Sequence, residues 1–176
     1  IELILPPAEQ SLSDVYRVGE RIKVYILSVE KTNKFPKILI SRKNEGLLKK
    51  LFEIEIPEIT SGIIEIKSVA REAGSRAKVA VYSAVPNIDT VGACIGQRGA
   101  RIKNIVDELN GERIDIVEWK PVVEEFVSAV LSPAVVSNVT ILEDGTARVL
   151  VEPSQLSLAI GKNGQNARLA ARLTGM

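Results

Sequence analysis

Two consecutive blocks of the chain, residues 47–120 and 121–176, carry the same order of predicted elements, and this duplication constrains the fold more than any single motif. Each block begins with an apolar helix and continues with two strands around a glycine turn. A short helix, a Gly-x-x-Gly tetrapeptide and a longer helix follow. The offset between matching positions falls from 75 residues at the first helices to 65 at the tetrapeptides. Short loop deletions within one repeated α-β-β-α-α-β unit explain this fall.

The apolar spacing supports an α+β fold in both blocks. The helix predicted at 100–109 has apolar residues at i, i+3, i+4 and i+7, namely Ile102, Ile105, Val106 and Leu109. The first helices of the two blocks have similar faces, formed by Leu47, Leu48, Leu51 and Phe52 and by Val122, Val123, Phe126, Val127, Val130 and Leu131. The chain stops where the first block has its last strand, so we expect the second block to lack that strand.

Residues 1–46 have strand character instead. Three runs rich in Ile, Val, Leu and Tyr are separated by turn-forming stretches: IELILPP, RIKVYILSVE and KILISRK. In the middle run, Ile22, Val24 and Ile26 alternate with other residues, which predicts a half-buried strand. Three short strands cannot close a barrel, so we expect the end of an all-β module. The absence of an initiator Met indicates a fragment of a longer protein.

The tetrapeptides Gly96-Gln97-Arg98-Gly99 and Gly161-Lys162-Asn163-Gly164 each follow an isoleucine and open into a predicted helix. A glycine bend there lets the backbone turn without a Cβ clash. It also leaves the unpaired N–H groups of the next helix pointing outwards, with the positive end of the helix dipole behind them. Such a place attracts phosphate, and the missing side chains allow a nucleic-acid backbone to approach closely.

Basic residues accompany both bends. Arg98 and Lys162 lie inside them, and Arg101, Lys103 and Arg168 follow within about two helical turns. They would supply charge that a chain of net charge +1 otherwise lacks. Helix caps beside solvated basic residues are the plain interpretation of one isolated bend. Two bends at equivalent positions favour the KH module, whose GxxG loop clamps about four backbone nucleotides, and neither bend has the pattern of a P-loop or a dinucleotide site.

The composition argues against catalysis. Histidine is absent and Cys94 is the only cysteine, which excludes Ser-His and Cys-His catalysis and an internal disulfide. One cysteine without histidine also argues against a zinc site, and no carboxylate spacing suggests acid–base chemistry. We therefore predict no catalytic residue, no metal and no cofactor. No run is long and apolar enough to suggest a membrane span.

Five side chains have a packing interpretation beside a functional one. Cys94 is expected to be a small buried or groove-lining hydrophobe rather than a reactive thiol. Trp119 is expected to pack between the two blocks rather than to stack on a base. Tyr16, Tyr25 and Phe35 would stack bases if further strands complete an OB-type barrel, and core or edge packing is the alternative for each.

Several long phrases resemble the NusA family of bacterial transcription elongation, termination and antitermination factors. They include RIKVYILSVEKTNKFPKILISRKNEGLLKKLFEIEIPEI, VGACIGQRGARIKNIVDELNGERIDIVEW and PSQLSLAIGKNGQNARLAARLTG. The resemblance extends through essentially the whole chain. It implies the C-terminal part of an S1 domain, an OB-type β-barrel, over residues 1–46. Two KH domains of the type II, prokaryotic topology are then implied over residues 47–120 and 121–176.

The resemblance also implies contacts with single-stranded nascent RNA. Together with the basic residues above, it assigns to RNA binding Ile95, Gly96, Gln97, Arg98, Gly99, Arg101 and Lys103 in the first unit and Ile160, Gly161, Lys162, Asn163, Gly164, Gln165 and Arg168 in the second. We further expect Ile95, Ile102, Ile160 and Leu169 to line grooves for unstacked bases. The short WKP linker contains proline, so the two units should be nearly fixed relative to each other.

The implied partners are RNA polymerase, mainly through an N-terminal domain absent from this sequence, and antitermination factors. The resemblance further implies a cytoplasmic, monomeric, non-enzymatic protein that modulates pausing, termination and antitermination. Two alternatives stay open. One is the RNA-binding accessory portion of a phosphorolytic exoribonuclease, in which a KH module precedes the S1 module. The other is a ribosome-associated KH protein.

Overall fold

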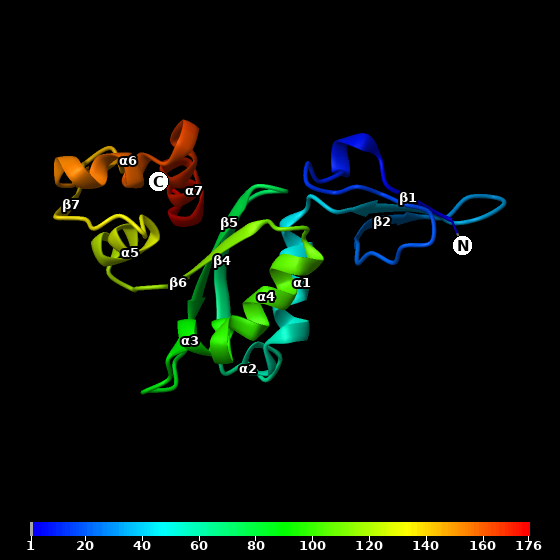
Figure 1. Cartoon of the computed structure of the whole chain (residues 1–176), viewed down its shortest axis with the longest axis horizontal. Helices are drawn as coiled ribbons and strands as arrows, with labels where there is room; N and C mark the ends of the chain where they lie inside the picture. The colour runs from blue at the N-terminus through cyan, green and yellow to red at the C-terminus, as the bar shows by residue number, and fades with distance from the viewer. Residues whose placement is uncertain (1) are drawn as a thin grey trace.

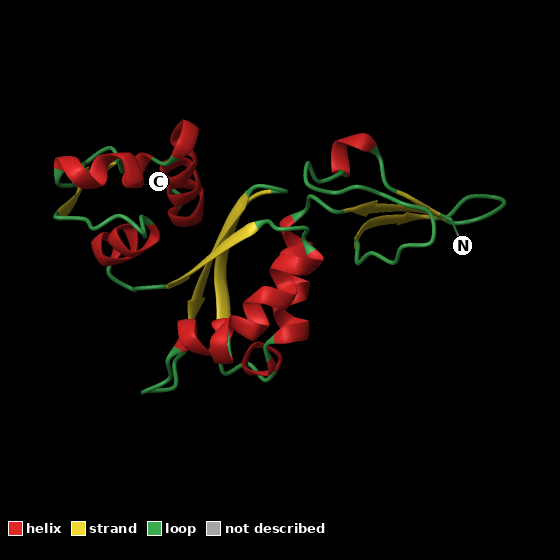
Figure 2. Cartoon of the chain, viewed as in Figure 1, coloured by secondary structure: helices red, strands yellow, loops and turns green. Residues whose placement is uncertain are grey.

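The computed structural model describes residues 2–176, which form three successive units (Figure 1). A small β unit comes first, and two units that mix helices and strands follow it (Figure 2). Within residues 2–176, no helix is both long and apolar enough to cross a membrane.

The N-terminal unit is a three-stranded open sheet. Its strands are β1 (Leu3–Ile4), β2 (Tyr25–Glu30) and β3 (Lys37–Ser41), in the order β1-β3-β2. The central strand β3 pairs in parallel with β1 and antiparallel with β2. The three strand-like runs are therefore present, and they do not close into a barrel among the described residues.

The alternation predicted for the middle strand of this unit is wrong. The strand begins at Tyr25, so Ile22 and Val24 lie before it, and Ile26 is 55% exposed. Tyr25 is the residue that packs, because its ring lies against the next unit over Gly46. A Cβ on Gly46 would lie 2.5 Å from the tyrosine ring. The neighbouring unit, rather than the pleat of the strand alone, selects the buried side chain.

The first α-β-β-α-α-β unit has the predicted order. Its elements are α1 (Glu45–Glu55), α2 (Pro57–Thr60), β4 (Glu65–Glu72), β5 (Arg76–Tyr82), α3 (Thr90–Ile95), α4 (Ala100–Glu108) and β6 (Arg113–Glu118). The sheet order is β4-β5-β6, with β4 antiparallel and β6 parallel to the central β5. Parallel pairing requires a crossover between the two strands, and here the crossover carries the first tetrapeptide.

The helices of the first unit cover one face of this sheet. The four apolar residues predicted to share a face of α1 are all buried, which confirms that prediction. Ile105 and Leu109 join them, and the cluster packs on Val79 and Val81 of β5. Burial of each such aliphatic side chain stabilises the fold by about 1.5–3 kcal/mol.

The second unit repeats this order over a smaller sheet. Its elements are α5 (Val123–Val130), β7 (Asn138–Ile141), β8 (Ala147–Leu150), α6 (Leu156–Ile160) and α7 (Gln165–Thr174). Among the described residues the sheet contains only the antiparallel pair β7–β8. The apolar face predicted for α5 is buried from Phe126 onwards, but Val122 and Val123 are 48% and 46% exposed. These two valines precede or begin the helix, outside the turns that reach the core.

The second unit packs on the back of the first unit's sheet. Helices α5 and α7 contribute Phe126 and Leu169 to a buried cluster that also contains Ala70 of β4, Ala80 of β5 and Val117 of β6. The sheet of the first unit therefore lies between its own helices and those of the second unit (Figure 1). The layers follow in the order α1/α4, β4–β6, α5/α7 and β7–β8.

Trp119 lies at this junction, as predicted. Its ring stands edge-on to Tyr82, with 5.3 Å between ring centroids and 80° between ring planes. The centroid of Phe126 in the second unit lies 6.3 Å from that of Trp119. The indole thus joins the end of the first unit to the first helix of the second, which supports the expectation of nearly fixed units.

Buried charges connect the three units. Lys78 of β5 is fully buried and donates to the Asp115 carboxylate at 3.1 Å and to the Ser132 carbonyl oxygen of the second unit at 2.9 Å. Burial lowers the pKa of Lys78. Arg42, also buried, donates to both carboxylate oxygens of Asp14 within the N-terminal unit, at 2.6 and 3.0 Å, and to the Glu108 carbonyl oxygen of the next unit at 2.9 Å. Breaking either set would leave an uncompensated buried charge.

Candidate nucleic-acid interface

The two tetrapeptides adopt the same backbone conformation. Gly96 has φ 77° and ψ 171°, and Gly161 has φ 75° and ψ 171°. The closing glycines agree as well, with φ 76° and ψ 15° at Gly99 and φ 75° and ψ 12° at Gly164. These positive φ values favour glycine. The duplication seen in the sequence therefore extends to individual dihedral angles.

The opening glycines, Gly96 and Gly161, are required for lack of space as well as for their backbone conformation. A Cβ on Gly96 would lie 2.7 Å from Cγ of Arg101, and a Cβ on Gly161 would lie 2.7 Å from the backbone N of Asn166. The closing glycines are less confined, since the nearest atom to an added Cβ would be 3.9 Å away in both loops. Each bend therefore folds back tightly on the first turn of the helix that follows.

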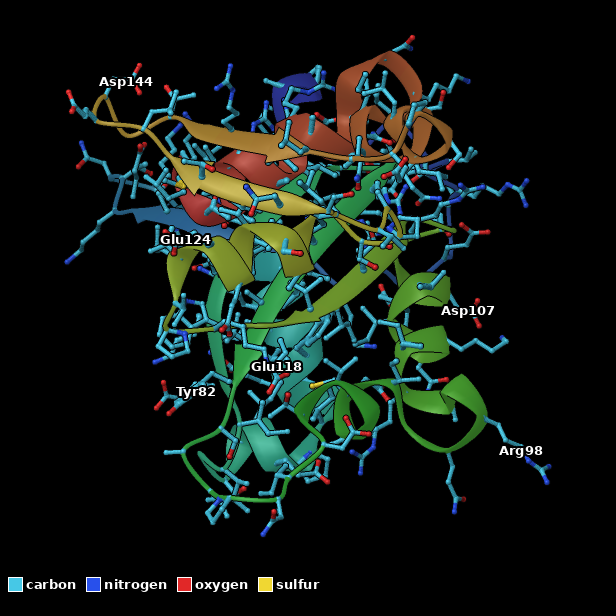
Figure 3. All side chains as sticks on the ribbon, turned by 90° about the vertical axis from the view of Figure 1, so that its left-hand side faces the viewer. Tyr82, Arg98, Asp107, Glu118, Glu124 and Asp144 are labelled. Atoms are coloured by element: carbon cyan, nitrogen blue, oxygen red, sulfur yellow. The ribbon has the colours of Figure 1, made fainter. Side chains whose placement is uncertain are left out.

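The residues between the glycines face solvent. Gln97, Arg98, Lys162 and Asn163 are all exposed, and Figure 3 shows the Arg98 side chain pointing away from the body of the molecule. Arg98 and Asn163, at the same position in the two bends, have φ of 53° and 54°. A left-handed conformation in a non-glycine residue costs about 1–3 kcal/mol, and such residues cluster at ligand sites. The first tip therefore holds a strained arginine in the open, whereas asparagine at the second tip tolerates this conformation better.

Helices α4 and α7 begin directly after the bends with uncapped N-termini. Their N-cap residues are Gly99 and Gly164, which have no side chain to accept the first N–H groups. The first N–H groups of the two helices, those of Ala100 and Gln165, donate to the carbonyl oxygens of Gln97 and Lys162. The positive end of each helix dipole is nevertheless directed at the bend, where it favours an anion. A backbone phosphate suits this arrangement because the glycines allow close approach.

A side chain in the first turn of the following helix latches each bend. Arg101 donates to the carbonyl oxygen of Ala93 at 2.7 Å, and Asn166 donates to that of Leu158 at 3.2 Å. Donors and acceptors occupy matching positions 65 residues apart. Arg101 also pairs with Glu58 at 2.8 Å, whereas the buried amide nitrogen of Asn166 lies within hydrogen-bond distance of three carbonyl oxygens, which share its two N–H groups. The Arg101 guanidinium is thus engaged within its own unit, and its contact with RNA stays a prediction.

Two of the residues predicted to contact RNA in the second unit are bonded to the first unit. Arg168 donates to both carboxylate oxygens of Glu72, from Nε at 2.5 Å and from Nη2 at 3.1 Å. Gln165 donates to the same carboxylate at 2.8 Å and to the Ser75 hydroxyl at 2.7 Å. Hydrogen bonding from Arg168 lowers the pKa of Glu72 from its ordinary 4.5 to about 2. The second bend therefore lies against the β4–β5 turn of the first unit.

The apolar residues expected to line base grooves divide into two groups. Ile95 and Ile160 are 37% and 46% exposed directly before the bends, as a groove wall requires. Leu169 is fully buried in the cluster between the units, so the prediction that it lines a groove is wrong. Ile102 packs partly against the core of the first unit. Helical periodicity identifies an inward face but does not distinguish a groove from a core.

Other side chains singled out from the sequence differ in their access to solvent. Lys103 is exposed and pairs with Asp107 one turn further along α4. Cys94 is fully buried, and burial raises the pKa of its thiol to about 11, which confirms a packing role. In the N-terminal unit, Phe35 is 79% exposed and Tyr16 is 39% exposed, so stacking on a base stays a prediction for both.

Two acidic residues of this interface, Glu58 and Glu72, were not predicted from the sequence. Glu58 lies 43 residues from its partner Arg101, and Glu72 lies 96 residues from Arg168. Neither pair falls at the spacing of one helix or one hairpin, so no local pattern could reveal it. The repeated bend was visible because its glycines are adjacent in the sequence.

The sheet topology, the repeated order of elements and the paired GxxG bends define the chain as a protein with tandem KH domains of type II topology. Comparison with known proteins agrees with this class. The profile of the NusA-like first KH domain matches residues 42–119, and that of the NusA-like second KH domain matches residues 123–176. The chain belongs to the NusA family.

Curated relatives named transcription termination/antitermination protein NusA match almost the full length of this chain. The protein of Halalkalibacterium halodurans is 54% identical over 176 residues, which cover 99% of this chain and 46% of the relative. That of Bacillus subtilis is also 54% identical, over 99% of this chain and 47% of its own length. That of Thermus thermophilus is 49% identical over 99% of this chain and 45% of its own length. The chain spans about half the length of these relatives.

The fold also resembles a solved structure of low sequence identity. The crystal structure of a protein called APE1850 matches with a TM-score of 0.52 and 22% identity, over 69% of this chain and 85% of that protein. At this identity the likeness concerns the fold alone.

Proposed function

We propose that this chain binds single-stranded RNA through its two GxxG bends and supplies this binding within a NusA-type transcription factor. The observation that carries the proposal is the repetition of the whole site. Both bends share their backbone angles, their uncapped helix N-terminus and their exposed tip. The names of the relatives, which are transcription termination/antitermination proteins, support the setting.

In the proposed mechanism, each bend holds backbone phosphates. The positive ends of the α4 and α7 helix dipoles favour the phosphates, and Arg98 and Lys162 supply charge at the tips. Ile95 and Ile160 supply apolar contact for unstacked bases next to the bends. Because the units share a buried cluster, two weak sites act as one stronger site through effective concentration.

For the whole protein, we propose that contact with nascent RNA modulates pausing, termination and antitermination by RNA polymerase. Antitermination factors are the further partners that this role implies. The chain contributes binding and no catalysis to it. Single-stranded RNA is the substrate class that the bends suit, because their open glycines accept a sugar–phosphate backbone without a fixed base sequence.

Charge reversal at the tips tests this function. Replacing Gln97-Arg98 or Lys162-Asn163 with Asp-Asp should weaken binding of a labelled single-stranded RNA on the order of tenfold or more, measured by fluorescence anisotropy. The matched control is Arg17-Val18→Asp-Asp, which makes the same change in charge at an exposed turn of the N-terminal unit. Circular dichroism should show that all three variants fold. Unchanged affinity in both tip variants would contradict the assignment of the bends.

A further inference from the structure

The second bend differs from the first in having its following arginine already bonded to an acid of the other unit. We propose that Glu72 of the first unit competes with RNA phosphate for Arg168 and thereby sets the affinity of the second bend. The inference rests on the RNA-binding function proposed above and names a residue outside the second unit that tunes it.

The geometry places the Arg168 guanidinium between the bend and the acid. Its Nη1 donates to the carbonyl oxygen of Asn163 at the tip, at 3.1 Å. Its Nε and Nη2 are both occupied by Glu72. A phosphate held by the bend would therefore lie within reach of the same guanidinium. Carboxylate and phosphate both accept two parallel hydrogen bonds from arginine, so they are alternative ligands for it.

The exchange of partners costs less than it would for a buried ion pair. The side chain of Arg168 is 44% exposed and that of Glu72 is 21% exposed, so solvent screens the pair. Partly exposed ion pairs contribute little net stability. Arg172, one turn further along α7, approaches Glu72 to 3.9 Å and remains as a second cation for the carboxylate when Arg168 leaves. RNA can therefore displace Glu72 from Arg168 without unfolding either unit.

Glu72 is not needed to hold the units together. The buried cluster between β4–β6 and the helices α5 and α7 joins them with apolar contacts. Lys78 joins them again through its bond to the Ser132 carbonyl oxygen. Because neither of these connections involves Glu72, a neutral residue at position 72 should leave the arrangement of the units unchanged. Its effect should fall on RNA binding.

The first bend has no corresponding competitor from another unit. Its tip residue Arg98 extends into solvent, and the acid that pairs with Arg101 is Glu58 of the same unit. Arg101 also latches the bend to Ala93, so its side chain is structural. Among the described residues, competition for an arginine by an acid of the other unit is therefore found only at the second bend.

The test is Glu72→Gln in the full chain, which keeps the shape of the side chain and removes its charge. Anisotropy titration with a labelled single-stranded 12-nucleotide RNA at about 50 mM salt should show binding about two- to fivefold tighter than wild type. The plot of log K against log salt should steepen by about 0.7, the value for one added phosphate contact on a single strand. The matched control is Glu65→Gln, which removes an acid paired with Lys67 at the other end of β4 and should leave affinity unchanged.

A double-mutant comparison separates competition from a structural effect. In the Arg168→Gln background, Glu72→Gln should no longer tighten binding, because the contested cation is gone. Unchanged or weaker binding by Glu72→Gln overturns the inference, as does an equal gain in Glu65→Gln or a gain that survives Arg168→Gln. In those cases RNA binding by the wild type and its loss in the tip variants would still uphold the proposed function. A wild type that binds no RNA would defeat both.

Discussion

Each of the two KH units contains a GxxG bend of the same geometry, but the side chains that support the bend differ between the units. The first unit has a core of its own, and its bend is latched by Arg101 with help from Glu58 of the same unit. The second unit builds its core on the back of the first unit's sheet. Its bend is latched by Asn166, and Glu72 of the first unit bonds to Arg168 in the helix that follows the bend. The backbone geometry of the bends is the same while the supporting side chains differ. We propose that the second unit depends on the first for its stability more than the first depends on the second.

The largest expected effect comes from cavities in the two cores. Leu48→Ala and Leu169→Ala each truncate a fully buried leucine and should each cost about 2–5 kcal/mol. Leu169→Ala should reduce hydrogen-exchange protection in residues 123–174 and leave β4–β6 protected. Leu48→Ala should reduce protection in both units, because the second rests on the first unit's sheet. Equal loss of protection across β4–β6 in Leu169→Ala would break the proposed one-way dependence.

A smaller effect should distinguish the two opening glycines. Alanine at either position takes an unfavourable positive φ, at a cost of about 1–3 kcal/mol. Gly161→Ala also meets the backbone N of Asn166, whereas Gly96→Ala meets Cγ and Cβ of Arg101, which belong to a side chain and can shift somewhat more than the backbone. We therefore expect a greater loss of stability in Gly161→Ala than in Gly96→Ala, measured by urea unfolding. Gly164→Ala, which has strain but no close contact, is the control and should lose less than Gly161→Ala.

The smallest effect concerns the ionisation of Glu72. Its carboxyl should titrate at about pH 2 in an NMR experiment, and in Arg168→Gln its pKa should rise towards 4.5. Because folding lowers the pKa, the contribution of this carboxylate to stability is fully present above about pH 4.5 and is lost as the pH falls through about 2. A wild-type midpoint near 4.5 would show that the pair with Arg168 does not persist, and the difference between the two bends would shrink accordingly.

Much of the fold was predictable from the spacing of apolar residues. The one-sided face of α1 and the glycine bends follow local rules of period and conformation, and both were confirmed. The sequence analysis did not predict that the two units share a buried cluster, although the composition of β5 indicates it. The segment from Ala77 to Val81 is buried throughout, and its nearly continuous small and apolar residues are typical of a strand covered on both faces.

The candidate site was predictable only where it is local. The glycines and tip residues are contiguous, so their shared role could be inferred from two tetrapeptides. The partners of Arg101 and Arg168 come from elements far away along the chain. From charge and helical position alone, both arginines are predicted to contact RNA, and their protein partners are not. Only the packing of the units shows which cations are already engaged by the protein.

The position of the first unit's sheet between two layers of helices has a consequence for the form of RNA that the proposed site would accept. Because helices of both units pack on this sheet, the two bends are held at a fixed distance from each other. The protein then loses little conformational freedom on binding, and the transcript must supply the adjustment. An RNA segment that is already folded into a hairpin would have to open before it could contact both bends. If the proposed RNA binding holds, we therefore expect an unstructured single strand to bind more tightly than a hairpin of similar length.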